Sequence, residues 1–446
     1  MSLKDLKAAA LKEIDANRES ILALARAIFA EPEEGYREVK TAAKVEAVFS
    51  EWGLKVQKGL ALTGVRGLLE CGAPGPRIGI LSELDAVINP DHPAADPGSG
   101  AVHACGHFAQ IAWMIGAGYG LRKILDGLAG SVVLFAVPAE EYINLEFREN
   151  LKKENKIQYL GGKQELIRLG AFEDIDLAMM QHAQSEMPGR KVFFTAGSNG
   201  FVGKTARFLG RASHAGFAPE RGINALNAFT LALSAIHAQR ETFRDEDMVR
   251  VHPILTRGGE SVNVVPSEVT TEMYARARTV EAIKDTSFKV DRALKAGALA
   301  TGTTLEISTT AGYMPLESDE KFSDIYAANA AELIGKENIH FQGPSGGSTD
   351  MGDLTHLIPG IHPWVGAFSG DLHSKDFKVE DEEMAFIIPA KLFAMTAIDL
   401  LADGAKKAKE IVSAFKPVYS REEYVRTLDR FTYKTRFEGE KPPTLE

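Results

Sequence analysis

The spacing of hydrophobic residues alternates between helical and strand-like patterns, which predicts a mixed α/β protein. Over residues 3–29, apolar residues recur at the three- and four-residue intervals of an amphipathic helix. A second helix is expected over 38–52, and short strands are expected over 64–70 and 77–82. The apolar, β-branched run 131–137 is typical of a buried strand in a parallel sheet.

A different pattern begins near residue 200 and lasts until about residue 313. It predicts strands over 204–209, 249–256, 269–278 and 303–310, and helices over 224–238 and 280–296. We expect Gly297 to end the second of these helices. The order β-α-β-β-α-β predicts a ferredoxin-like α+β domain.

The α/β pattern resumes after Pro315, so this small domain is predicted to be an insertion. The catalytic domain would then comprise residues 1–199 and 314–446, and the inserted domain residues 200–313. A helix is expected over 323–333, a strand over 364–368 and a long helix over 382–403. Residues 404–446 are predicted to form an appended helix and a tail.

Polar side chains follow several of the predicted strands in the first domain. Glu83 and Asp85 come after one strand, Glu140 and Glu141 follow the apolar run, and His182 ends a short strand over 175–182. Open α/β sheets place their sites at the carboxyl ends of strands, so we expect these side chains to converge. Adjacent carboxylates often start a solvated helix, but a bound metal would also relieve their repulsion.

Cys105 and His107 flank Gly106 just before an apolar helical run over 109–121. A thiol and an imidazole at this spacing supply half of a transition-metal site. The start of a helix would lower the pKa of the thiol and favour the thiolate. On its own, the pair is also compatible with simple packing.

Chain length, net charge and cysteine content exclude several classes of protein. A chain of 446 residues is too long for one core, which predicts two domains. The net charge of −10 argues against nucleic-acid and membrane partners. The two cysteines are too few for a disulfide framework, and no apolar run of membrane-spanning length is apparent. We therefore expect a cytoplasmic protein.

Eight short motifs follow one another along the chain, at residues 83–86, 103–107, 138–141, 181–182, 210–215, 262–266, 276 and 372–374. Taken together and in this order, they resemble the M20 metallopeptidase/amidohydrolase family in its aminoacylase-like branch. The stretch around Ser348–Asp353 resembles aminobenzoyl-glutamate hydrolase-like members in particular.

The resemblance implies a catalytic domain with one or two divalent metal ions and an inserted lid domain through which the chain forms a homodimer. The implied metal ligands are Cys105, His107, Glu141, His182 and His373, with Cys105 shared between the ions. Glu140 would be the general base, and Asp85 would orient a ligand. His214 would stabilise the oxyanion in the partner's site, while Asn263 and Arg276 would hold the substrate.

The implied reaction is hydrolysis of an amide bond in a small N-acyl, aminobenzoyl or dipeptide-like substrate with a free carboxylate. The mixed ligand set suits zinc or manganese, and also cobalt. The sequence departs from the family at Phe108–Ala109–Gln110, where an Asp and a second His are common. Two alternatives stay open: another C–N hydrolysis, such as deamination of an aromatic amine, and a non-enzymatic binding protein.

Overall fold

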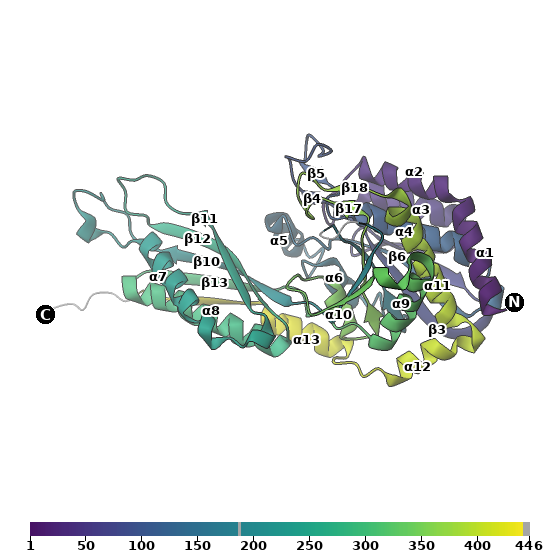
Figure 1. The fold of residues 1–446 in the computed structure, drawn as a ribbon. Helices are drawn as coiled ribbons and strands as arrows, with labels where there is room; N and C mark the ends of the chain where they lie inside the picture. The colour runs from purple at the N-terminus through teal and green to yellow at the C-terminus, as the bar shows by residue number, and fades with distance from the viewer. Residues whose placement is uncertain (186–188, 440–446) are drawn as a thin grey trace. The chain divides into compact units, whose positions relative to one another are not determined.

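The structure is a computed structural model that describes residues 1–185 and 189–439. The chain divides into two compact units (Figure 1). The first unit contains Met1–Gly197, Glu317–Gly343 and Asp353–Arg421, and the second begins with Ser198–Leu316. The ends of the segment Ser198–Leu316 lie within three residues of those expected for the inserted domain.

The second unit also includes two segments that we assigned to the catalytic domain. These are Pro344–Gly352 and residues 422–439. The first assignment differs because residue 345 pairs with residue 198 of the second unit. The second differs because strand β19 (Tyr433–Phe437) pairs with β13 (Thr304–Ala311).

A six-stranded mixed sheet forms the centre of the first unit, in the order β1-β2-β6-β3-β7-β15. The strands β3, β6, β7 and β15 run parallel, whereas β1 and β2 pair antiparallel at one side. The sheet consists of β1 (Lys55–Leu60), β2 (Gly64–Glu70), β3 (Ala73–Glu83), β6 (Ala129–Val137), β7 (Leu177–Met179) and β15 (Gly360–Ile361). The predicted apolar run is the fully buried β6.

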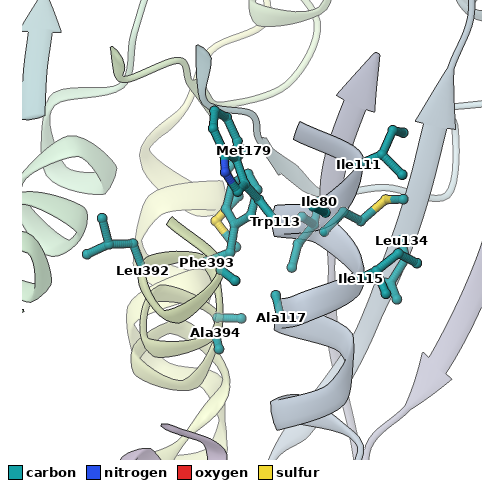
Figure 2. Close-up of a cluster of buried hydrophobic side chains, with 14 of the residues drawn as sticks. Ile80, Ile111, Trp113, Ile115, Ala117, Leu134, Met179, Leu392, Phe393 and Ala394 are labelled. Atoms are coloured by element: carbon teal, nitrogen blue, oxygen red, sulfur yellow. The ribbon is translucent and has the colours of Figure 1, made fainter. Parts of the chain in front are cut away.

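Helices α4 (His107–Leu121) and α11 (Ile388–Leu401) pack on this sheet and against each other. Figure 2 shows their side chains between the two helices and strands β3, β6 and β7, with Trp113 and Phe393 among them. Nearly every residue of α4 is buried, which matches its apolar composition. Helices α1 (Leu3–Ala16) and α2 (Arg18–Phe29) cover α4 on its other side.

The longest apolar helical stretch among the described residues, Glu383–Leu401, has the length and mean hydropathy (1.8) of a membrane span. However, 94% of it is buried inside the first unit, as is typical of a core helix. It begins with a turn of π-helix, Glu383–Ile387, and continues as α11.

Smaller elements complete the first unit. A four-stranded sheet has the order β14-β9-β16-β8. Its strands are β8 (His182–Ala183), β9 (Val192–Thr195), β14 (Ile339–Gln342) and β16 (Trp364–Val365). Short pairs are formed by β4 (Val87–Ile88) with β5 (Ala101–Val102), and by β17 (Phe368–Ser369) with β18 (Lys378–Val379). The remaining α-helices are α3 (Val39–Glu51), α5 (Leu145–Lys153), α6 (Gly162–Arg168), α9 (Glu320–Ile334) and α12 (Lys406–Ala414). Helix α10 (Met351–Thr355) spans the boundary between the units, which falls after Gly352.

The second unit has the predicted β-α-β-β-α-β order. Its elements are β10 (Gly200–Leu209), α7 (Ala225–Ala238), β11 (Arg250–Arg257), β12 (Glu268–Ala277), α8 (Val280–Thr301) and β13. The sheet is antiparallel, in the order β11-β12-β10-β13-β19, so the ferredoxin-like arrangement gains a fifth strand from the C-terminal region. Residues alternate between buried and half-buried along β12, and α7 and α8 pack on the sheet (Figure 1).

Three predictions about helices were wrong. The first expected helix is two helices, because Asn17 leaves the helical conformation (φ −102°, ψ 14°). Helix α8 continues through Gly297 to Thr301. Gly297 lies where α8 approaches α7, and a Cβ there would be 2.7 Å from the Ala232 nitrogen, so the glycine permits close packing. The C-terminal region contains α12, α13 (Arg421–Phe431) and β19 where we expected one helix and a tail.

Candidate metal centre

The acidic residues at the ends of β3 and β6 lie at one edge of the central sheet. The strands are parallel neighbours, and Glu83 is in register with Val137. The chain leaves both strands at the same edge, where the Glu141 N–H donates to Asp85 Oδ2 at 2.8 Å. The acidic residues that follow β3 and β6 therefore lie at one edge of the sheet, as expected, and this hydrogen bond links the two segments.

Cys105 and His107 reach this edge from the start of α4. Gly106 between them has φ +91°, a left-handed conformation that favours glycine. His373 approaches from the returning part of the chain, and its backbone N–H donates to the Ala104 oxygen at 2.8 Å. His182 opens β8 in the smaller sheet, although we expected it at the end of a longer strand.

The structure brings the five expected ligands together in two overlapping groups. In each group the candidate ligand atoms all lie within 4.8 Å of one another: Cys105, His107 and His182 form one, and Cys105, Glu141 and His373 the other. Cys105 Sγ is 3.4 Å from His182 Nε2 and 3.2 Å from His373 Nε2. Cys105 is common to both groups, which is the position that a ligand shared by two ions would occupy.

The charges within the cluster favour the thiolate of Cys105 and the carboxylate of Glu141, the forms in which these two residues bind cations. Burial and the Glu141 carboxylate oppose ionisation of Cys105, but the imidazoles of His182 and His107 outweigh them and lower the pKa of the thiol to about 6. The Glu141 carboxylate, 3.1 Å from His373 Nε2, raises the pKa of His373 to about 11. Burial opposes ionisation of Glu141, yet His373 brings its pKa down to about 2. The thiolate and the carboxylate are therefore stabilised before any ion binds.

The ring of His107 is held by Asp85. His107 Nδ1 lies 2.9 Å from the Asp85 carbonyl oxygen and 3.2 Å from Asp85 Oδ1, which fixes the ring and leaves Nε2 for the cluster. A carboxylate that contacts the second nitrogen of a ligating imidazole is a common means of orienting it. The role of Asp85 in orienting a ligand stays a prediction, and these contacts support it.

The donor set fits divalent metal ions. Buried His107 Nε2 and Glu141 Oε1 lie 3.1 Å from Glu83 Oε2 and His373 Nε2, but within the described part of the chain neither atom makes a hydrogen bond. A buried polar atom without a hydrogen bond is costly, so a bound group that satisfies both atoms is expected. One thiolate, three imidazoles and a carboxylate form a donor set typical of zinc and related transition metals.

Sequence reasoning missed a buried network next to His107. Glu83 Oε2 is 3.1 Å from His107 Nε2, and Glu83 also forms a candidate ion-binding group with His107 and Glu140. Lys163 Nζ lies 2.6 Å from Glu83 Oε1 with both side chains fully buried, and Gln110 Nε2 donates to Glu83 Oε2 at 2.8 Å. Glu83 was visible in the acidic motif, whereas nothing in the sequence around Lys163 indicated its partner.

The remaining predicted residues belong to the second unit. His214 is exposed, and its Nδ1 accepts from the N–H groups of Gly216 and Phe217 at 3.2 and 3.0 Å. Asn263 lies close by, because its backbone oxygen accepts from the Ala215 N–H at 2.9 Å. Arg276 is on β12, where its Nη1 donates to Ser348 Oγ at 2.8 Å. The structure therefore brings His214 and Asn263 together and places Arg276 on a different element of that unit.

Phe108, one of the departures from the family pattern, lines a cavity of about 710 Å³ in the first unit. Aromatic residues form much of the wall: Phe29, Phe108, Phe377 and Phe386. Among the described residues, its lining contains none of the predicted ligands. Gln110, the other departure, belongs to the Glu83 network, so the two departures affect different parts of the unit.

Comparison with known proteins agrees with this geometry. The model of the peptidase family M20/M25/M40 matches residues 79–394. The chain belongs to this family. It is 30% identical to the mouse (Mus musculus) Xaa-Arg dipeptidase over 425 residues, which cover 90% of each chain. It is 28% identical to one component of the p-aminobenzoyl-glutamate hydrolase of Escherichia coli, over 52% of this chain and 51% of that one.

Among solved structures, the YXEP protein of Bacillus subtilis, described as a dinuclear metal-binding peptidase of the M20 family, has the same fold. The TM-score is 0.67 at 22% identity, with 87% of this chain and 99% of that chain covered. The family resemblance and the α/β fold class predicted from the sequence are confirmed. The chain is an M20 metal-dependent hydrolase of amide or peptide bonds, so the alternative of a non-enzymatic binding protein was wrong.

Proposed function

We propose that this M20 hydrolase cleaves the amide bond of a dipeptide-like, N-acyl or aminobenzoyl amino acid that carries a free carboxylate. The observation that supports this most directly is the cluster of Cys105, His107, Glu141, His182 and His373 with Glu140 next to it. Dipeptides come first among the substrates, because the relative named Xaa-Arg dipeptidase is similar over 90% of the chain.

Each residue of the cluster would have a distinct role in this reaction. Cys105, His107, Glu141, His182 and His373 would hold divalent ions, which, when bound, lower the pKa of water towards neutrality. Glu140 would take a proton from the attacking water and pass it to the leaving amine, so it must stay free of the ions. Arg276 and Asn263 would hold the substrate, and His214 would donate to the oxyanion.

We further propose that the ions are zinc or manganese, with cobalt as a further option. The thiolate of Cys105 and three imidazoles favour zinc, and carboxylate donors are also compatible with manganese. Both cysteines of the chain are free thiols, which favours a reducing compartment, and we propose a cytoplasmic location.

A substrate panel assayed with metal analysis tests the proposed function. Chelated protein would be reconstituted separately with zinc, manganese or cobalt. It would then be assayed on Xaa-Arg dipeptides, other dipeptides, N-acyl amino acids, p-aminobenzoyl-glutamate and aromatic amines. We expect hydrolysis of carboxylate-bearing amides only in the reconstituted samples. Ammonia release from the amines without amide cleavage would favour deamination instead.

We also propose that the chain forms a homodimer through its second unit. Strand β11 is at one edge of the sheet, whereas β19 covers the opposite edge. Ile254 and Leu255 on β11 are exposed, and so are Phe217, Leu231 and Val262 of the same unit. An unpaired edge and exposed apolar side chains together favour an isologous contact between two copies.

Complementation tests whether His214 acts in the partner's site. Mixing inactive His214→Ala and Glu140→Gln variants should give heterodimers with one intact composite site. Because one of the two sites in each heterodimer is intact, a heterodimer should have up to about half the activity of a wild-type dimer. If the mixture stays inactive although mass analysis shows that the protomers exchange, His214 does not act in the partner's site.

A further inference from the structure

The turn that carries the predicted general base has an unfavourable backbone conformation. Ala139, directly before Glu140, has φ +54°, in the left-handed region that non-glycine residues rarely adopt. An alanine keeps this conformation only where its surroundings hold it. The direction in which the chain presents Glu140 and Glu141 therefore depends on what holds Ala139.

Glu38 contacts this turn from the start of helix α3. Its side chain is fully buried, and its Oε1 accepts from the Ala139 N–H at 2.7 Å. Its Oε2 accepts from Thr63 Oγ1 at 2.7 Å, so both carboxyl oxygens are engaged. Gly35, three residues earlier, also lies against the turn, where a Cβ on it would be 2.8 Å from the Ala139 Cα.

Other contacts hold the turn at different atoms. The Gly162 N–H donates to the Ala139 oxygen at 3.0 Å, the Glu141 N–H donates to Asp85, and Arg148 donates to the Glu141 oxygen. Among the described residues, the hydrogen bond from the Ala139 N–H goes to Glu38. Because φ is the rotation about the N–Cα bond, a bond to this N–H acts directly on the unfavourable angle.

We propose that Glu38 is a positioning residue that holds Ala139 in its left-handed conformation and thereby directs Glu140 toward the metal centre. The consequence for catalysis rests on the proposed role of Glu140, whereas the effect on the turn does not. A longer or shorter side chain at residue 38 would shift the acceptor of the Ala139 N–H and so rotate the backbone just before Glu140. Small displacements of a catalytic group cost much of its rate advantage.

Three variants separate positioning from general stability. Glu38→Ala removes the bond and should lower kcat by about 10- to 100-fold with little change in KM or bound metal, since a displaced base affects the chemical step. Glu38→Gln keeps an acceptor for the Ala139 N–H and a donor for Thr63, so it should retain most of the activity. The double variant Glu38→Ala/Ala139→Gly should recover part of the loss, because glycine adopts a positive φ without a Cβ clash.

Glu33→Ala is a matched control. Glu33 is an acid in the same loop, but its carboxylate accepts from the N–H groups of Lys40 and Thr41 at the start of α3 and does not bond to the turn. It should affect stability and leave kcat unchanged. If Glu38→Ala proves insoluble, Glu38→Asp replaces it, because the shorter side chain keeps the carboxyl group and loses the reach.

Amide hydrogen exchange provides a readout that does not depend on activity. Glu38→Ala should speed exchange in the peptide that contains Ala139, while Glu33→Ala should not. Faster exchange with no activity in any variant or the wild type would refute the proposed function and leave the role of Glu38 intact. Unchanged exchange, a wild-type kcat in Glu38→Ala or no recovery in the double variant would overturn the positioning role.

Discussion

Both the position and the pKa of Cys105 favour its role as a metal ligand. It belongs to both ligand groups, and neighbouring imidazoles lower its pKa to about 6 although it is buried. The other cysteine, Cys71, lies outside every candidate ion-binding group found among the described residues, and burial raises its pKa to about 12. The two thiols of this chain therefore form a natural pair for comparison.

We predict that Cys105→Ala binds at least one metal equivalent less than the wild type after reconstitution, because the shared ligand is gone. Cys71→Ala should bind the wild-type amount. Elemental analysis of the two variants side by side is the measurement. Equal loss in both would mean that the effect comes from the fold and not from ligation.

Glu38 also predicts how stability depends on pH. Burial, together with the charge of Asp85, raises the pKa of Glu38 from 4.5 to about 8. The folded chain therefore keeps a proton that the unfolded chain releases in this range. The contribution of this group to stability is complete below pH 4.5 and is lost as the pH rises through about 8.

From this group alone, the free energy of unfolding should fall by about 1.4 kcal/mol per pH unit inside that window. Glu38→Gln cannot titrate, so its stability should decline less with pH than that of the wild type. Urea unfolding of chelated wild type and variant, at several pH values between about 5 and 8, measures the difference. Parallel curves would contradict the buried, neutral carboxyl.

For individual residues, the sequence predicted which candidate ligands come together, but it did not predict the buried residues around them. The strand-end acids and the Cys-Gly-His spacing could be identified because both depend on local order along the chain. The contact of Lys163 with Glu83 depends on where the fold brings α6, which no local pattern encodes. A buried lysine cannot be told from a surface lysine until its partner is located.

At the scale of elements, the site depends on where strands end and where α4 begins. Parallel pairing brings the ends of β3 and β6 to one edge, and the left-handed Gly106 lets the chain turn into α4 between two candidate ligands. A Cβ on Gly106 would lie 2.5 Å from the Ala183 Cβ, next to His182. The turn therefore has two reasons to require glycine.

We predict that Gly106→Ala destabilises the protein by about 1–3 kcal/mol, because it adds both backbone strain and a clash. It should also weaken metal binding, since Cys105 and His107 are displaced together. Urea unfolding and metal titration measure the two effects. Gly98→Ala is a suitable control, because Gly98 lies in a loop where a Cβ would be 3.4 Å from the Asp96 Oδ1 and no positive φ is required.

Strongly periodic elements were predictable and interrupted ones were not. The β-α-β-β-α-β order of the second unit was confirmed, and its strands β12 and β13 alternate regularly between buried and half-buried residues. The break at Asn17 lies inside an uninterrupted helical pattern, so periodicity conceals it. Gly297 was interpreted as a helix end, but close packing between α7 and α8 decides its role.

At the scale of the whole molecule, the site combines segments that are far apart along the chain. His373 comes from the part of the first unit that follows the inserted second unit. In the cluster it joins ligands that lie between Cys105 and His182 in the sequence. The discontinuous organisation was predictable because the α/β pattern visibly resumes. The pairing of β19 with β13 was not, since a short polar strand at the C-terminal end has no distinctive pattern.

The proposed mechanism depends on the roles of two adjacent carboxylates, with Glu141 as a metal ligand and Glu140 as the base. Glu140→Gln and Glu141→Gln, reconstituted in parallel and compared for bound metal and kcat, test it most directly. We predict that Glu140→Gln keeps the wild-type metal content while kcat falls by about 10²- to 10⁴-fold, and that Glu141→Gln loses metal. The opposite pattern, with metal lost in Glu140→Gln and kept in Glu141→Gln, would contradict the account.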